Sequence, residues 1–457
     1  MRQPLIISSW RTHSSRLSGF HHQTISFRSS RLPETDDTCF DVQYVPLEGV
    51  ENLERYRPGG YHPIVIGECL HDRYDIVHKL GSGGFSTIWL ANDRTTGRYV
   101  AVKVNTAAAS LCRESSILRQ LNSTILKRPV HPGKSVIPHI LGEFSLDGPN
   151  GKHQCLVTVP ARMNINEAKD ASRFRLFQLP VARAIIAQLV QGVAFLHSQG
   201  IAHADLHLGN ILLRLPASIQ RLSPAQFYEK YGQPSHEPVV RFDNQTLPQG
   251  VPTHGIMPVW LGDGSENISL SEAEIFLTDY GESFMPSMTP RYYSNTPDLL
   301  VPPEVYFLRQ KPLSFSADIW ALAIIMWSIM GQKEIFEAHL PYADWMIKEH
   351  VETLGKLPRE WWSTWEARLK WFNEDGVRVD GCIGRPLEER FRTSIQKPRL
   401  EDGEVGEVCK EEKDALLALF KSMMKFRPDE RPSIDEILGS EWIRKWALPD
   451  YEKMRNG

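Results

Sequence analysis

The sequence lacks paired cysteines, a long apolar run and a strong net charge. Its six cysteines include no C-x-x-C pair and no zinc-ligand spacing with histidine, which favours reduced thiols in an intracellular protein. The longest apolar run, Ala321–Trp327, has seven residues, whereas a membrane span needs about 20. We therefore expect no membrane span, and a helix buried on all sides there. The formal net charge of −3 argues against a nucleic-acid-binding protein, which is usually basic.

Acidic residues are absent from the N-terminal segment before Glu34. The first 33 residues contain five Arg and eight Ser, a composition typical of a mitochondrial transit peptide. The alternative is a disordered basic arm of a cytoplasmic or nuclear protein. We assign residues 1–40 to this arm or transit peptide, and expect the protein in the cytoplasm, the nucleus or both, with mitochondrial targeting as the other interpretation.

The remaining chain predicts an α+β fold of two lobes. Residues 74–80, 87–91 and 99–104 read as strands joined by short turns, which suits an antiparallel sheet. Apolar residues recur at helical spacing from 180 to 197, and the part from 316 to 446 is helical. We expect a β-rich small lobe with one helix over 41–161 and a mainly helical lobe over 162–457. Seven prolines between 216 and 258 indicate an insertion at about 215–274.

A glycine-rich turn separates the first two predicted strands. Glycines let the backbone approach phosphates and point N–H groups at them. A strand follows the turn instead of a helix, so it is not a dinucleotide-binding fingerprint. Alone it could be an ordinary hairpin. The candidate nucleotide-binding residues here are Leu80, Gly81, Ser82, Gly83, Gly84, Phe85, Ser86 and Ile88.

The third predicted strand carries a lysine among apolar residues, in the string Ala101-Val102-Lys103. Burying an unpaired ammonium is costly. Phosphates of ATP and a carboxylate would compensate for that cost, and Glu114 at the start of the next helix is the candidate carboxylate. The alternative is an edge-strand lysine in water. We include Ala101, Lys103 and Glu114 in the nucleotide site.

Two further strings carry carboxylates. His203-Ala204-Asp205 is followed by Asn210, and an apolar stretch leads into Asp279-Tyr280-Gly281. Asp205 would accept the proton of an acceptor hydroxyl, while Asn210 and Asp279 would bind Mg²⁺. The order of the four strings is that of ATP-dependent phosphoryl transfer. The predicted catalytic residues are Asp205, Lys103 and Asn210, with ATP and Mg²⁺ as cofactors.

From about Gly59 to Trp446 the chain resembles the eukaryotic protein kinases. Val301–Glu304 resembles their A-P-E motif, and Arg427–Pro432 resembles a late motif whose arginine pairs with that glutamate. The resemblance therefore implies a Glu304–Arg431 ion pair and a bilobal kinase fold.

Within that family the chain is similar to the SR-protein kinases and their fungal relatives, through Gly59–Pro63, Phe85–Ala91 and the insertion after the catalytic loop. This similarity implies a serine/threonine protein kinase acting on Arg/Ser-rich protein or peptide substrates. It also implies a hinge at Thr158–Ala161 against which adenine stacks. We expect a monomer with no direct nucleic-acid or membrane partner.

Several residues depart from the family pattern. Ala204 replaces an arginine that normally reads an activation-loop phosphate, which predicts a kinase not switched on by phosphorylation there. His207 replaces a lysine that contacts the transferred phosphate, which predicts lower turnover. Only ten residues separate Lys103 from Glu114, a gap shorter than in most kinases.

Two other functions remain open. Ala204 and His207 would suit a pseudokinase or scaffold of the same fold. The string His203–Asn210, called the catalytic string below, also resembles that of small-molecule kinases of the aminoglycoside or choline type. A cluster of acidic residues could attract a basic peptide or, more simply, form a solvated helix face: Glu334, Glu337, Asp344, Glu349 and Glu352.

Overall fold

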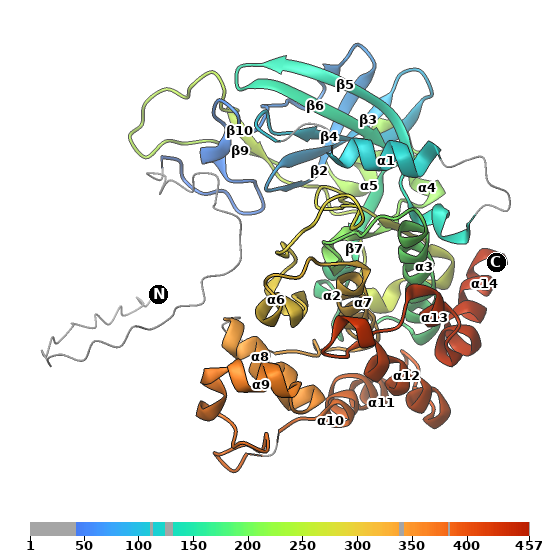
Figure 1. Ribbon diagram of the computed structural model, residues 1–457. Helices are drawn as coiled ribbons and strands as arrows, with labels where there is room; N and C mark the ends of the chain where they lie inside the picture. Colours follow the sequence, from blue (N-terminus) through green and yellow to red (C-terminus); the bar gives the residue numbers. More distant parts are fainter. Residues whose placement is uncertain (1–42, 110–112, 124–130, 338–341, 383, 457) are drawn as a thin grey trace, which may run out of the picture.

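The computed structural model describes residues 43–109, 113–123, 131–337, 342–382 and 384–456. The expectation for the N-terminal arm therefore lies outside the described residues. A β-rich lobe stands above a larger helical lobe (Figure 1), so the predicted α+β bilobal fold is confirmed. The four cysteines among the described residues are free thiols.

The small lobe is a six-stranded antiparallel sheet in the order β1-β2-β3-β4-β6-β5. Alternate side chains of these strands pack into one core with Trp89, Val102 and Val157, each at most 2% exposed. Helix α1 (Arg113–Ser123) contacts β5. Its buried Ile117, Leu118 and Leu121 join a cluster that includes Leu156 of β6 and side chains of the large lobe. The strands are β1 Cys69–Leu70, β2 Tyr74–Gly83, β3 Ser86–Asp93, β4 Arg98–Asn105, β5 Ile140–Gly148 and β6 Gly151–Thr158.

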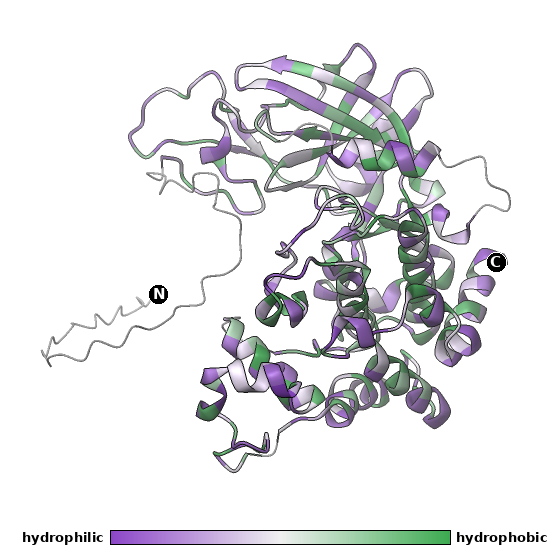
Figure 2. Cartoon of the chain, viewed as in Figure 1, coloured by the Kyte–Doolittle hydropathy of each residue, from purple (hydrophilic) through white to green (hydrophobic). Residues whose placement is uncertain are grey.

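The large lobe is built around two apolar helices, α3 (Leu179–Ser198) and α7 (Phe315–Met330). Helix α7 includes the apolar run Ala321–Trp327, which is buried as predicted. Helix α3 is long and apolar enough to cross a membrane, but 89% of its apolar window is buried inside the protein. Figure 2 colours much of α3 as hydrophobic, with its neighbours covering it. It is therefore placed as a core helix.

Shorter helices surround this pair. A tryptophan cluster of Trp361, Trp362 and Trp365 joins α8 (Ala343–Leu354) to α9 (Arg359–Thr364), which explains the tryptophan-rich sequence. The other helices of the lobe are α2 Ile165–Asp170, α6 Glu304–Phe307, α10 Leu387–Phe391, α11 Lys397–Asp402, α12 Lys410–Met423, α13 Ile434–Leu438 and α14 Leu448–Asn456.

A buried ion pair connects α6 to the loop before α13. Two guanidinium nitrogens of Arg431 donate to the two carboxylate oxygens of Glu304, at 2.8 and 2.6 Å. The Arg431 side chain is 0% exposed and also donates to the carbonyl oxygens of Lys425, Phe426 and Ser316. The ion pair implied by the resemblance is thus confirmed.

A small antiparallel sheet at the junction of the lobes brings the two carboxylate strings together. It contains β7 (Ala161–Asn164), β8 (Ile211–Arg214) and β11 (Ile275–Leu277), in the order β11-β8-β7. The catalytic string ends where β8 begins, and Asp279 follows the end of β11. The register Leu277↔Ile211 therefore places the ends of these two strings side by side.

The predicted insertion contains short elements that pack on the small lobe. They are α4 Ala217–Gln220, α5 Pro224–Tyr231, β9 His236–Pro238 and β10 His254–Ile256. Phe227 of α5 is 0% exposed and lies in one cluster with Val77 and Tyr99 of the sheet. These elements are too short to produce a clear periodicity, which is why the sequence pattern weakens here.

Candidate active site

The glycine-rich turn connects β2 to β3, with Gly83 paired to Ser86. A methyl group added at Gly81 or Gly83 would meet nothing within 4 Å, so open space lies beside this backbone. Phe85 at the tip is 70% exposed. Ile88 lies opposite Lys103 in the register of β3 and β4, and Ala101 lies on the same strand as Lys103. The turn thus leaves its backbone accessible to a ligand.

Lys103 of β4 forms an ion pair with Glu114 of α1, with 2.7 Å between Nζ and Oε2. A carboxylate oxygen of Asp279 lies 3.8 Å from the same ammonium. Burial favours the neutral amine, but the charges of Glu114 and Asp279 outweigh it, so the pKa of Lys103 is raised. The lysine is therefore a fixed cation facing the junction of the lobes. The short gap between Lys103 and Glu114 does not prevent their pairing.

The catalytic string is held by its histidine. Asp205 donates its backbone N–H to Nδ1 of His203 at 3.3 Å, and Nε2 of that ring lies 3.1 Å from the carbonyl oxygen of Thr278. Because Nδ1 accepts, the proton sits on Nε2 and is donated to Thr278. One neutral imidazole thus joins the loop of Asp205 to the loop of Asp279.

Asn210 is turned toward Asp205. Its amide nitrogen donates to the backbone oxygen of Asp205 at 2.9 Å and to Oδ2 at 3.3 Å. Its backbone carbonyl oxygen accepts the backbone N–H of Thr278 at 2.9 Å. With the amide nitrogen fixed on Asp205, the amide oxygen faces the other way and can serve as a cation ligand.

Asp279 lies in a backbone conformation that is uncommon outside glycine, with φ at +63°. The Lys103 charge lowers the pKa of Asp279, so its carboxyl is ionised at neutral pH. The following residue, Tyr280, is 0% exposed and donates its hydroxyl to the carbonyl of Leu277 at 2.8 Å. Its ring lies 5.3 Å from that of His203. The buried tyrosine therefore anchors the turn that presents Asp279.

His207 faces Asp205. The backbone N–H of Gly209 donates to Nδ1 of His207 at 3.1 Å, so the proton of the neutral ring sits on Nε2. That nitrogen lies 3.7 Å from Oδ2 of Asp205. His207 thus presents an N–H beside the carboxylate of Asp205.

Asp318 of α7 positions the catalytic string, a role that the sequence pattern did not assign. Its carboxylate accepts the backbone N–H groups of His203 and Ala204 at 2.8 and 2.9 Å, and lies 2.9 Å from Nε2 of His197. Burial alone would raise the pKa of Asp318, but its hydrogen bond to His197 and the neighbouring charges lower it overall. The ionised carboxylate stabilises Ala204 at φ +62°.

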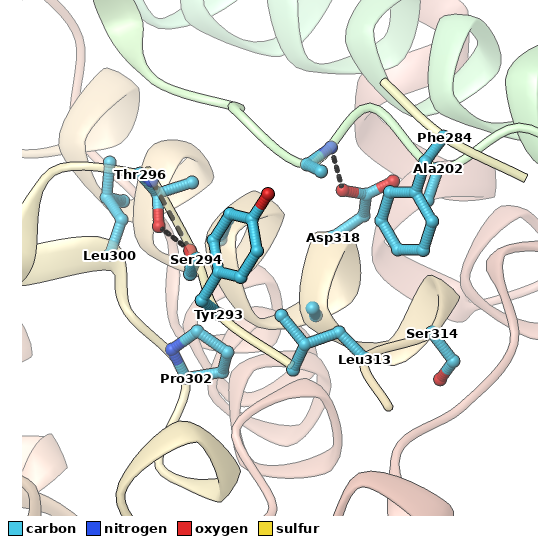
Figure 3. Close-up of a pocket in the computed structure, with 13 residues that line it drawn as sticks. Ala202, Phe284, Tyr293, Ser294, Thr296, Leu300, Pro302, Leu313, Ser314 and Asp318 are labelled. Atoms are coloured by element: carbon cyan, nitrogen blue, oxygen red, sulfur yellow. Dashed lines mark hydrogen bonds between the residues drawn. The ribbon is translucent and has the colours of Figure 1, made fainter. Parts of the chain in front are cut away.

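A small hollow lies under the segment that follows Asp279 (Figure 3). Ala202, Phe284 and Leu313 line it on one side, and Tyr293 and Ser294 line it on the other. Ala204 also lines it, at the position where most kinases have an arginine.

Arg291 anchors the same segment from within. It is 5% exposed and donates from Nη1 to the backbone oxygen and the carboxylate of Glu282, at 2.6 and 2.9 Å. Its guanidinium also lies 4.7 Å from the ring centroid of Phe284. The segment is thus held by its own arginine. No sequence motif indicates this role.

The acidic residues considered for peptide attraction are occupied by internal partners. Glu349 pairs with Arg390 at 3.0 Å and Glu352 pairs with Lys348 at 3.0 Å. Glu337 pairs with Arg385, Asp344 accepts from Trp365, and Glu334 accepts from Ser328. Glu349 is only 4% exposed, so the interpretation as a solvated helix face is wrong there. Each of these carboxylates thus has a partner within the described chain.

The donor set fits a magnesium nucleotide. An ammonium and open glycine-rich backbone suit phosphates, while the amide oxygen of Asn210 and the carboxylate of Asp279 are hard ligands that suit Mg²⁺. Within the described ranges, no group of three or more His, Cys, Asp or Glu could hold a metal. A magnesium ion would therefore need phosphate oxygens and water as its other ligands, which is its usual preference.

Comparison with known proteins agrees with this geometry. The family model described as "Protein kinase domain" matches residues 74–222 and 265–443. It thus omits 223–264, inside the predicted insertion. A serine/threonine protein kinase of Aspergillus fumigatus is 24% identical over 94% of this chain and 98% of its own length. The serine/threonine-protein kinase SRPK of Physarum polycephalum is 26% identical over 85% of this chain and 90% of its own. Human SRSF protein kinase 3 is 32% identical over 45% of this chain and 36% of its own.

Proposed function

The chain belongs to the protein kinase family and is a relative of the SR-protein kinases, and from that premise we propose that it transfers the γ-phosphate of ATP to serine or threonine hydroxyls of proteins. One observation carries the proposal. The ammonium of Lys103 is paired with Glu114 at 2.7 Å and lies 3.8 Å from Asp279. The lysine proposed to bind phosphate, its carboxylate partner on α1 and a carboxylate proposed to bind Mg²⁺ therefore lie together.

Each residue has a defined task in this proposal. Lys103 holds the α- and β-phosphates while Glu114 fixes its position. Asn210 and Asp279 would hold Mg²⁺, which when bound neutralises charge on the phosphates. Asp205 orients the acceptor hydroxyl and accepts its proton, and His207 beside it contributes one N–H donor. Backbone between Thr158 and Ala161, where β6 gives way to β7, would contact adenine.

The geometry favours an active enzyme over a pseudokinase. Ala204 keeps its backbone hydrogen bond to Asp318 although it lacks a guanidinium. Arg291 anchors the segment that follows Asp279, which supports activity without phosphorylation of that segment. Lys103, Asp205, Asn210 and Asp279 all remain present. We expect turnover to be reduced by His207, because a neutral imidazole stabilises phosphate charge less than a lysine does.

Arg/Ser-rich proteins are the proposed substrates. This choice rests on the relatives named as SRPK and SRSF protein kinase. The acidic side chains of α8 do not carry it, because Glu349 and Glu352 already pair with basic residues of the chain. Phosphatase-treated protein should therefore transfer the γ-phosphate of ATP to a peptide of alternating Arg and Ser when Mg²⁺ is present.

A matched peptide panel tests this specificity. The same peptide with Lys in place of Arg should react more slowly, because Lys lacks the planar guanidinium fork, and the peptide with Ala in place of Ser should not react. Choline and aminoglycosides should not react either. Transfer to these alcohols but not to peptides would overturn the proposal in favour of a small-molecule kinase. Tight nucleotide binding without any transfer would establish the pseudokinase.

A further inference from the structure

Residues 43–61 precede the range matched by the kinase family model, which begins at residue 74. They pack with the far part of the insertion, which that model also omits. Tyr44, Leu53 and Tyr56 share a buried cluster with Val239 and Val251. The two segments outside the range of the family model thus form one unit beside the small lobe (Figure 1).

This unit reaches the tip of the glycine-rich turn. Tyr61 is 3% exposed and donates its hydroxyl to the carbonyl oxygen of Gly83 at 2.8 Å. The guanidinium of Arg55 lies 5.3 Å from the ring centroid of Tyr61 and 5.7 Å from that of Phe85. A methyl group added at Gly84 would lie 3.5 Å from Arg55. Arg55 and Tyr61 therefore contact both the strand end and the tip of the turn.

The same unit holds the connection between Lys103 and Glu114. The backbone oxygens of Gly59 and Gly60 accept from Ala108 and Ala107, at 2.7 and 3.0 Å. Gly60 admits no side chain, because a methyl group there would lie 1.7 Å from the backbone oxygen of Arg55. The connection that separates the phosphate-binding lysine from its carboxylate partner is thus bonded to the preceding segment.

Further bonds join this unit to the insertion and to β2. The side-chain amide of Asn150, which is 3% exposed, donates to the carbonyl oxygens of Tyr61 and Gly250, both at 2.7 Å. Glu51 forms an ion pair with the fully buried Lys79, and the backbone of Val259 donates to the carbonyl oxygen of Lys79 at 2.9 Å. This unit is therefore anchored to β2 and to the insertion.

We propose that residues 51–61, supported by the insertion, form a brace that holds the glycine-rich turn over the phosphates of the nucleotide, with Tyr61 and Arg55 as positioning residues. The inference rests on the proposed function, since it assigns ATP to this site. Glycine-rich backbone loses much conformational freedom when it is ordered. A hydroxyl fixed on Gly83 removes part of that cost before the nucleotide binds.

The brace acts on the phosphate end of the nucleotide and not on its base. The Tyr61 hydroxyl bonds to Gly83 at the end of the turn, whereas the proposed adenine contacts lie at Thr158–Ala161. Loss of the Tyr61 hydroxyl should therefore weaken binding of Mg²⁺-ATP and leave binding of adenosine unchanged. A role in overall stability alone would weaken both ligands to the same degree.

Tyr61→Phe tests the brace, and Tyr228→Phe is its matched control. The Tyr228 hydroxyl also donates to a carbonyl oxygen of β2, that of Val77, at 2.8 Å, but away from the turn. Calorimetry on the full chain should show about three- to tenfold weaker Mg²⁺-ATP binding for Tyr61→Phe, the usual range for one hydrogen bond. Adenosine binding should stay within about twofold, and the control should match wild type for both ligands.

Each other outcome has a defined meaning. Equal ATP affinity in Tyr61→Phe and Tyr228→Phe overturns the brace, as does an equal loss for ATP and adenosine. If Tyr61→Phe fails to fold, Arg55→Gln provides the same comparison, because it removes the charge over Phe85 and keeps the buried tyrosine. Wild-type protein that does not bind Mg²⁺-ATP would instead contradict the proposed function itself.

Discussion

Replacing Lys103 by Met should lower kcat/KM for ATP by about 10²–10³-fold, the usual cost of removing one preorganised charge-stabilising group from an active site. The ammonium lies 2.7 Å from Glu114 and 3.8 Å from Asp279, so nothing else on β4 can replace it. Methionine keeps most of the side-chain length and its apolar packing. Steady-state kinetics with an Arg/Ser peptide and varied ATP measures the effect.

Lys152→Met is the matched control for that variant. Lys152 is an exposed lysine on β6 of the same sheet, and its loss should leave kcat/KM within about twofold of wild type, because exposed charges contribute little. Thermal unfolding of both variants should stay close to wild type. If Lys103→Met retains more than half of wild-type kcat/KM, Lys103 is not the phosphate-binding lysine.

Replacing Arg431 by Met should lower the free energy of unfolding by about 3–5 kcal/mol, because it leaves the carboxylate of Glu304 buried and unpaired. The pair is bidentate, and both side chains are at most 5% exposed. Arg431 also satisfies the carbonyl oxygens of Lys425 and Phe426. Urea unfolding followed by tryptophan fluorescence measures the change.

Arg94→Met provides the comparison for that loss. Arg94 pairs with Asp75 at 2.7 Å, with side-chain exposures of 55% and 32%, and a surface pair of this kind contributes about 0–1 kcal/mol. A loss below about 1 kcal/mol for Arg431→Met as well would show that the Glu304 pair is no more important than a surface pair. The account of how α6 is held to the loop before α13 would then be wrong.

The order of the strings was enough to predict the fold and to name the residues that the structure brings together. Lys103 and Asp279 lie far apart in the sequence, yet each stands in a string whose chemistry restricts its position. The expected Glu304–Arg431 pair followed from resemblance and is present. These features depend on local motifs, and local motifs are readable from one sequence.

Contacts between distant segments could not be predicted in this way. Asp318 receives two backbone N–H groups from the catalytic string, but its sequence context shows only the start of an apolar helix. Arg291 anchors the segment that follows Asp279 through Glu282, although no sequence motif marks it. Glu349 looked like part of a solvated face because the partner Arg390 lies 41 positions along the chain. The roles and burial of such residues depend on partners that lie far away in the sequence, and periodicity does not reveal these partners.

The insertion shows the same limit on a larger scale. Its prolines and short helices carry no periodicity, so its packing on Val77 and Tyr99 through Phe227 was not foreseen. Tyr61 belongs to a string that resembles the SR-protein kinases, but nothing in that string indicates a bond to Gly83. Long-range contacts of this kind require the folded chain.

Transfer of labelled γ-phosphate from ATP to an Arg/Ser peptide, with wild type beside Asp205→Asn, tests the central claim most directly. Wild type should phosphorylate serine only with Mg²⁺ present, and Asp205→Asn should lose at least about 10²-fold in rate, the contribution of a positioned general base. The variant should still bind Mg²⁺-ATP, since Asn210, Asp279 and Lys103 are unchanged. Asp375→Asn, an exposed aspartate in the large lobe, should react like wild type. Near-normal transfer by Asp205→Asn, or none by folded wild type that binds Mg²⁺-ATP, would contradict the account.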